Sequence, residues 1–101
     1  MKQYILVKDS VPLGFAMAGV AHASLGGYLQ FKDTAEVKEW LSGPFNVAVC
    51  KVTAAEFEKA KLVPDNVVIT ESRLGGAETC LVFRPRAEWP KAFKFFPLYG
   101  A

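Results

Sequence analysis

The sequence contains only two cysteines and one histidine, too few for a disulfide-built scaffold or for the usual ligand sets of structural zinc. Cys50 and Cys80 each lie inside an apolar run, and they are far apart in the sequence. We therefore expect two buried free thiols, with a disulfide or a metal pair as the alternative interpretation. Neither a metal nor a cofactor is expected.

The sequence also lacks a strong net charge and a membrane-spanning run. Its formal net charge is +2, so a nucleic-acid partner would have to meet a local basic patch. The apolar segment from Leu13 to Ala23 imitates a signal peptide, but Lys8, Asp9 and Ser10 precede it and do not form the expected basic start. Because glycine, serine and histidine interrupt residues 12–31, no stretch has the character of a membrane span. A cytoplasmic protein without membrane contact is expected.

What the chain does have is a high apolar content, 51% of its 101 residues, with many aromatic side chains among them. This composition is typical of a globular protein and excludes a disordered segment. The length allows one hydrophobic core, so residues 1–101 are expected to form a single domain.

Strand and helix patterns alternate along the chain. Apolar runs predict the strands, and capping signals followed by helical spacing predict the helices. The expected order is a strand at 3–8, helices at 14–29 and from an N-cap at 33–34 to Gly43, a strand at 45–52, a helix at 53–61, and strands at 67–70 and 78–84. The first three strands are expected to run parallel, and the fourth to form an antiparallel hairpin with the third. The predicted fold class is α/β: a three-layer sandwich with a four-stranded mixed sheet and helices on both faces.

The helix expected at 14–29 is apolar on nearly every face. Ala16, Gly19, Ala23, Gly26 and Gly27 gather on one side at helical spacing, which permits the helix backbone to approach a sheet closely. Larger apolar side chains cover the other side. We therefore expect this helix to be sandwiched between the sheet and another element.

A basic aromatic tail ends the chain, with Phe93, Phe95 and Phe96 interleaved with Lys91 and Lys94. One interpretation is a stacking surface for nucleic acid. The alternative is a tail that closes over the sheet or over a partner subunit.

Several segments occur in an order known from one hydrolase family. They are Ala21-His22-Ala23-Ser24-Leu25-Gly26, a helix with Trp40, Ile69-Thr70-Glu71, Gly75-Gly76, Thr79 through Pro85, and the closing Phe95-Phe96-Pro97-Leu98-Tyr99. In this order they resemble the type 2 peptidyl-tRNA hydrolase family over nearly the whole chain. The resemblance implies that family's fold, hydrolysis of the ester between a peptide and tRNA, tRNA as a partner, and a monomer or homodimer that needs no metal or cofactor.

The resemblance also implies where the reaction takes place. The family's acid after the third strand corresponds to Glu71, which is expected to orient water, and the threonine of its fourth strand corresponds to Thr79, which is expected to donate a hydrogen bond. The family's turn before the first helix supplies a lysine, but this chain has no lysine or arginine between Asp9 and Phe31. Arg73 is expected to replace that lysine as a substrate-binding cation. The alternative is that Glu71 and Arg73 form a solvated ion pair in a loop.

Two further candidates follow from their own chemistry. Lys8 ends the first strand, where α/β sheets usually place ligands, so it is either a substrate-binding residue or a surface lysine. His22 is a candidate catalytic acid or base, because an imidazole exchanges protons near neutral pH. The alternative is a core histidine that donates a hydrogen bond to a backbone carbonyl.

The function therefore has two main interpretations. The first is a peptidyl-tRNA hydrolase, and the second is a non-catalytic binding module that kept the fold and lost the lysine. A different hydrolase or transferase on the same scaffold is a third, since fold does not fix chemistry. The turn from Ser10 to Phe15 discriminates between the first two. A basic side chain from Arg73, Arg84 or Arg86 folded into this turn favours the enzyme, whereas an apolar lining alone favours binding of a small molecule or a peptide.

Overall fold

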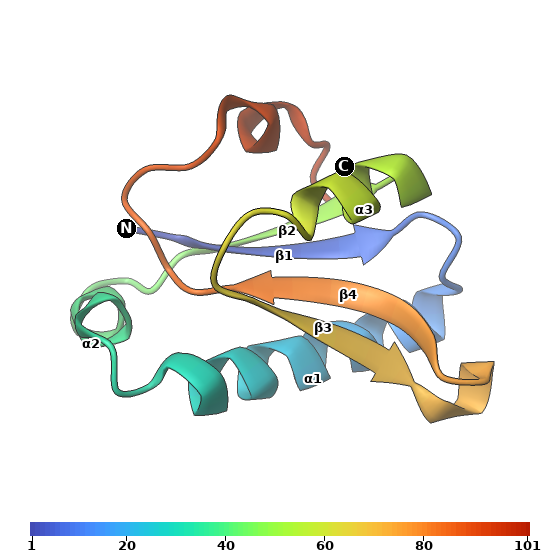
Figure 1. The fold of residues 1–101 in the computed structure, drawn as a ribbon, viewed down its shortest axis with the longest axis horizontal. Coiled ribbons are helices and arrows are strands. Elements are labelled where there is room, and N and C mark those ends of the chain that lie inside the picture. The colour runs from blue at the N-terminus through green and yellow to red at the C-terminus, as the bar shows by residue number, and fades with distance from the viewer.

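The computed structural model describes residues 1–101 and contains a four-stranded mixed sheet and three α-helices (Figure 1). The strands are β1 (Gln3–Lys8), β2 (Val47–Val52), β3 (Asn66–Glu71) and β4 (Ala77–Phe83). The helices are α1 (Leu13–Phe31), α2 (Ala35–Ser42) and α3 (Ala54–Ala60), and two 3-10 turns are η1 (Ser72–Leu74) and η2 (Lys91–Phe95). The predicted α/β class and the predicted order of strands and helices are confirmed.

The strand order in the sheet is β2-β1-β4-β3. β1 pairs in parallel with β2, and β4 pairs antiparallel with both β1 and β3. β1, β2 and β3 therefore run in one direction, as predicted, and the predicted hairpin between β3 and β4 is confirmed. β4 lies inside the sheet and β3 at its edge, which agrees with their burial. Residues 79–83 are fully buried, whereas most of β3 is only half-buried.

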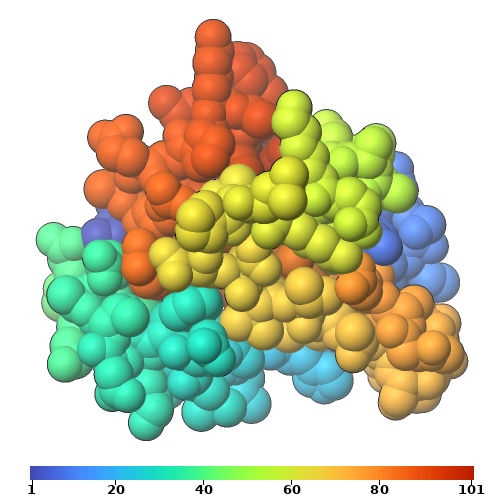
Figure 2. Space-filling model, viewed as in Figure 1, coloured from blue at the N-terminus to red at the C-terminus, as the bar shows by residue number.

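Helices cover both faces of the sheet, as predicted. On one face α1 packs against the strands, with Ile5, Val7, Cys80 and Val82 beneath it. On the other face α3 and the C-terminal segment contribute Phe57 and Phe93 to a second core cluster. Successive strand residues alternate between the two clusters, because side chains of a strand point to opposite faces in turn. Figure 2 shows α3 and the C-terminal segment side by side on the visible surface.

Capping residues fix where the two short helices begin. At α2 the Thr34 hydroxyl accepts a hydrogen bond from the Val37 amide at 3.3 Å. At α3 Thr53 and Glu56 form the predicted capping box, in which each side chain accepts a hydrogen bond from the other residue's amide at 3.1 and 2.9 Å. These bonds satisfy amides that have no partner within the helix.

α1 approaches the sheet closely through small residues, as predicted. A methyl group built on Gly19 would lie 2.9 Å from the Cys80 sulfur, and one built on Gly27 would lie 2.8 Å from a methyl group of Val82. Glycine at these two positions therefore permits a helix-to-sheet distance that alanine does not.

The expectation that α1 is covered on both sides is wrong. In Figure 1 the helix runs beneath the sheet, and no other element lies beyond it. Leu13, Met17, Leu25 and Tyr28 are exposed on its outer side. The sequence pattern described the helix correctly, but this chain provides no second covering layer. Neither α1 nor any other helix has the length and hydropathy of a bilayer-spanning segment.

The aromatic tail closes over the sheet, which was one of the two predicted alternatives. Trp89 and Phe93 stack on one another with ring centroids 5.4 Å apart, and both contact Tyr4 edge-on. Residues 97–99 then lie along the outer edge of β2, where Leu98 bridges to Cys50. The tail is therefore part of the fold, although Phe95 remains exposed.

Candidate functional site

At the C-terminal end of β3, an acidic and a basic residue form an ion pair with several hydrogen bonds. The Glu71 carboxylate accepts hydrogen bonds from the Arg73 backbone amide at 2.9 Å and from the Arg73 guanidinium at 2.9 and 3.2 Å. Glu71 is also the N-cap of η1, so the same carboxylate ends the strand and begins the turn. Gly75, in the left-handed conformation, ends that turn and directs the chain into β4. The predicted loop ion pair is therefore present, and it is built into the hairpin.

The bonding sets the charge state of both side chains. The side-chain and backbone hydrogen bonds from Arg73, assisted by the charges of Arg73 and His22, lower the pKa of Glu71 from 4.5 to about 2. The carboxylate in turn raises the pKa of Arg73. Glu71 is thus ionised at neutral pH, and three donors of Arg73 already occupy its two oxygens.

Arg73 reaches the start of α1. Its guanidinium carbon lies 4.9 Å from the ring centroid of Phe15, a cation–π contact at the end of the turn that lacks a lysine. The Arg73 side chain is still 64% exposed. The other two arginines considered for this role lie at the far end of β4, where Arg84 pairs with Asp65 at 3.1 Å and Arg86 stacks on Trp89. Of the three, Arg73 is the one that provides a cation beside this turn.

A β-bulge determines the place of Thr79. The pairing of β3 with β4 shifts by one residue at this point: Ile69 lies opposite Cys80, whereas Thr70 lies opposite Glu78. Because of the extra residue, Thr79 and Cys80 both face Gly19 of α1 instead of pointing to opposite faces. The Thr79 side chain is fully buried, and its hydroxyl donates to the Ile69 carbonyl at 3.3 Å.

His22 is exposed, so the alternative of a core histidine is wrong. The buried side of α1 is formed by Ala16, Gly19, Ala23 and Gly27, and His22 lies off this side. Gly26, four positions along the helix, faces the side chain of Ile69 on β3. His22 therefore lies on the flank of α1 that borders β3, where its charge acts on Glu71.

Lys8 lies apart from the other candidates. It follows Tyr4 and Leu6 in the alternation of β1 and so points to the face covered by α3. There its ammonium lies 4.7 Å from the ring centroid of Phe57. The fold thus brings His22, Glu71, Arg73 and Thr79 to the border between α1 and the β3–β4 hairpin, and it places Lys8 on the other side of the sheet.

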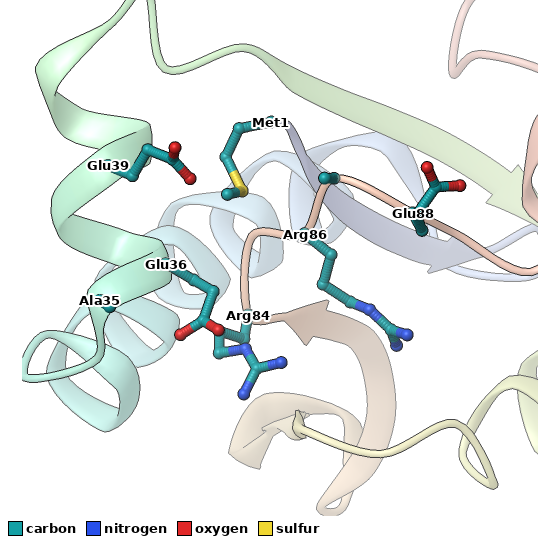
Figure 3. A pocket seen from close by; sticks show the side chains of 8 residues that line it. Met1, Ala35, Glu36, Glu39, Arg84, Arg86 and Glu88 are labelled. Atoms are coloured by element: carbon teal, nitrogen blue, oxygen red, sulfur yellow. The ribbon is translucent and has the colours of Figure 1, made fainter.

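A large surface hollow was not anticipated from the sequence. It measures about 540 Å³ and lies at the other end of β4, between α2 and the chain after the strand (Figure 3). Arg84 and Arg86 border it together with Glu36, Glu39 and Glu88. The only sequence signal for this hollow is the close spacing of charged residues within α2 and within the segment after β4. That spacing cannot reveal that the two segments lie next to one another in the fold. The lining mixes both signs and so does not select one class of ligand.

The cysteines and acidic residues do not assemble a metal site. Cys50 and Cys80 are both buried free thiols, as predicted. No group of three or more histidine, cysteine, aspartate or glutamate side chains is placed to hold a metal ion.

No model of a known protein family matches the chain, and no curated protein sequence matches it either. The resemblance to type 2 peptidyl-tRNA hydrolases thus stays a prediction from the quoted segments. Function has to be inferred from the arrangement of the site itself.

Proposed function

We propose that the protein hydrolyses the ester between a peptide and tRNA at the border between α1 and the β3–β4 hairpin. The observation that carries the proposal is the fixed position of Arg73. Its guanidinium is held by Glu71 and by the ring of Phe15, on the same border as the exposed His22. A cation and a proton acceptor on one exposed border are two requirements of ester hydrolysis on a phosphate-bearing substrate. A substrate made by translation also implies a cytoplasmic enzyme.

Arg73 is the residue suited to the substrate's negative charge. A guanidinium carries five N–H donors, and Glu71 accepts from Nε and Nη2. The remaining donors are available to a phosphate oxygen or to the oxyanion that forms when water attacks the ester carbonyl. In the family, a lysine in the turn before the first helix has this role. Arg73 takes the role here, because this chain has no lysine in that turn.

His22 is the residue suited to proton transfer. In the proposed reaction its imidazole takes a proton from water while the water oxygen bonds to the ester carbonyl carbon. The tetrahedral intermediate then collapses, the bond between the acyl carbon and the ribose oxygen breaks, and the imidazolium returns the proton to that oxygen. The products are a peptide carboxylic acid, which loses its proton to solvent, and a tRNA with a free hydroxyl, so no co-reactant besides water is needed.

Glu71 and Thr79 act through other groups in this reaction. A carboxylate with a pKa of about 2 and both oxygens occupied is a poor base, so Glu71 positions Arg73 instead of activating water. Thr79 gives its hydroxyl to the Ile69 carbonyl and is out of reach of solvent, so it stabilises the bulge. Lys8, on the other side of the sheet, stays a predicted contact for more distant tRNA phosphates.

The test is incubation of the protein with a labelled peptidyl-tRNA. We expect turnover by the wild type, and a loss of at least about 100-fold in kcat/KM for His22→Ala and for Arg73→Ala. Arg86→Ala is the matched control, because it removes an arginine at the far end of β4, and it should leave kcat/KM unchanged. No turnover by the wild type at high enzyme concentration removes the proposal. Unchanged turnover in both variants removes the assignment of residues.

The binding module remains the second candidate, and a specific observation favours it. Glu71 is buried with both oxygens already accepting hydrogen bonds, and Thr79 is fully buried, so neither of these predicted catalytic groups is open to a substrate. A module of this kind would bind tRNA with a steep salt dependence, weakened by Arg73→Ala, and would release no peptide. Binding without turnover in the same experiment selects this alternative.

A further inference from the structure

α1 is a 19-residue helix without a single Asp, Glu, Lys or Arg, and its outer side is open to solvent. The exposed apolar residues on that side form what we call the outer stripe: Leu13, Met17, Ala21, Leu25, Tyr28 and Leu29. The five large side chains among them are between 45% and 67% exposed. A contiguous apolar surface of this kind on a folded protein marks an interaction site.

The apolar surface continues beyond the helix. A hollow of about 340 Å³ separates the second half of α1 from α2, and Leu25 and Tyr28 line it together with Leu41 and Phe45. Leu41 and Phe45 are themselves exposed. With the outer stripe they offer on the order of 800 Å² of accessible surface, about what each partner buries in a protein interface of standard size. The patch is therefore large enough to hold a partner of folded-protein size.

We propose that the outer stripe is the contact surface of a homodimer, in which two α1 helices run in opposite directions and cross at about 50° on a two-fold axis at Ala21, the angle at which rows of residues four apart pack into one another. Such an axis places residues whose numbers sum to 42 opposite one another. Met17 then faces Leu25 of the partner subunit, and Leu13 faces Leu29 of the partner subunit. Tyr28, the bulkiest member, faces Gly14 of the partner subunit, where no side chain occupies the space. Small residues stand at the axis and opposite the largest side chain, so the stripe is complementary to itself.

The charges of the chain favour a second copy over other occupants. Self-association places like charges opposite one another wherever a surface is charged. The outer stripe contains no charged side chain, and His22 lies off it on the flank that borders β3. A helix that lies on a membrane surface instead carries lysine or arginine along the border of its apolar face, which α1 does not. The homodimer also supplies the second covering layer that the apolar pattern of α1 predicts and that the single chain does not contain.

The first experiment measures the mass of the wild-type protein in solution by light scattering and by sedimentation equilibrium. We expect twice the chain mass of 11.1 kDa at micromolar concentration. Ala21→Glu places two carboxylates against each other at the axis and should give the monomer mass with an unchanged circular dichroism spectrum. Leu62→Glu is the matched control, since Leu62 is 84% exposed on the other face of the sheet, and it should stay dimeric.

A second experiment does not depend on weakening the contact. Both native cysteines are buried, so Ala21→Cys provides one accessible thiol. A short bismaleimide should join two copies of Ala21→Cys in high yield, whereas Leu62→Cys should stay uncoupled. A wild-type monomer at high micromolar concentration, a dimeric Ala21→Glu variant, or a monomer that sediments with phosphatidylcholine vesicles would each overturn the proposal. These readouts are masses and cross-links, so their failure is distinct from failure of peptidyl-tRNA hydrolysis.

Discussion

Gly26 and Gly27 are neighbours in the middle of α1, and they should respond in opposite ways to the same substitution. Each glycine costs the helix about 1 kcal/mol relative to alanine, so Gly26→Ala and Gly27→Ala gain the same amount from helix propensity. The two positions differ in what the new methyl group meets. At Gly26 its nearest neighbour is the end of Ile69 at 3.5 Å, an ordinary van der Waals contact.

At Gly27 the methyl group meets Val82 at 2.8 and 3.4 Å and the amide nitrogen of the Gln3 side chain at 3.3 Å. Val82 belongs to the central strand β4 and is completely buried, and a valine side chain has little rotamer freedom. Overpacking of this kind costs about 1–3 kcal/mol. Gly26→Ala should thus stabilise the protein by about 1 kcal/mol. Gly27→Ala should be less stable than Gly26→Ala by about 1–3 kcal/mol, because the propensity gain is common to both.

The assay is urea unfolding at one protein concentration, followed by tryptophan fluorescence, with the midpoint and the slope fitted separately. The double variant Gly27→Ala with Val82→Ala tests the cause, because removal of the valine methyl groups makes room for the new one. Its loss of stability should be smaller than the sum of the two single losses by about 1 kcal/mol or more. Equal midpoints for Gly26→Ala and Gly27→Ala would refute the close approach of α1 to β4.

Three further variants or probes test single contacts. Because Arg73 lowers the pKa of Glu71 to about 2, the stabilisation by this ion pair is complete above about pH 5 and lost as the pH falls toward 2. Glu71→Gln should flatten the pH dependence of the urea midpoint in that window, and an unchanged slope would contradict the pairing. Thr53→Ala removes one half of the capping box and should cost about 1 kcal/mol in urea unfolding. Burial raises the pKa of Cys50 and of Cys80, so both thiols should react with a disulfide reagent only as fast as the protein opens; fast labelling would contradict their burial.

Local signals predicted most of the fold. The apolar run at 3–8 gave the bounds of β1 as the structure has them, and the capping box at 53–56 gave the start of α3. The side of α1 that faces the sheet was also predictable, because small residues at helical spacing permit the closest approach. The ends of α1 differ from the predicted 14–29, because the helix begins one residue earlier, at Leu13, and ends two residues later, at the buried Phe31. Each of these features depends on neighbours in sequence.

The features that prediction missed depend on contacts between distant segments. The bulge at Thr79 arises from a register shift against β3, and nothing in the sequence of β4 alone signals it. The outer side of α1 shows the same limit in another form. An apolar pattern states that a surface will be covered, but it does not state whether the cover belongs to the same chain. The interpretation of His22 as a core histidine is wrong for the same reason, because the side chain lies at an exposed border.

Glu71 and Arg73 show how two competing interpretations can describe one structure. The sequence offered an arginine that replaces a missing lysine, or a loop ion pair with no further role. The structure contains the ion pair, and the same bonds aim the guanidinium at Phe15 beside the turn without a lysine. A lysine could not reproduce this geometry, because a single ammonium cannot bind the carboxylate through two parallel bonds and still offer a planar set of free donors. In the proposed reaction, Arg73→Lys should therefore lower kcat/KM nearly as much as Arg73→Ala, although the charge is kept. Glu71→Gln should lower it as well, without changing the shape of the pH profile. A pH profile of kcat/KM that changes shape in Glu71→Gln would assign the proton transfer to the Glu71 carboxylate instead of His22.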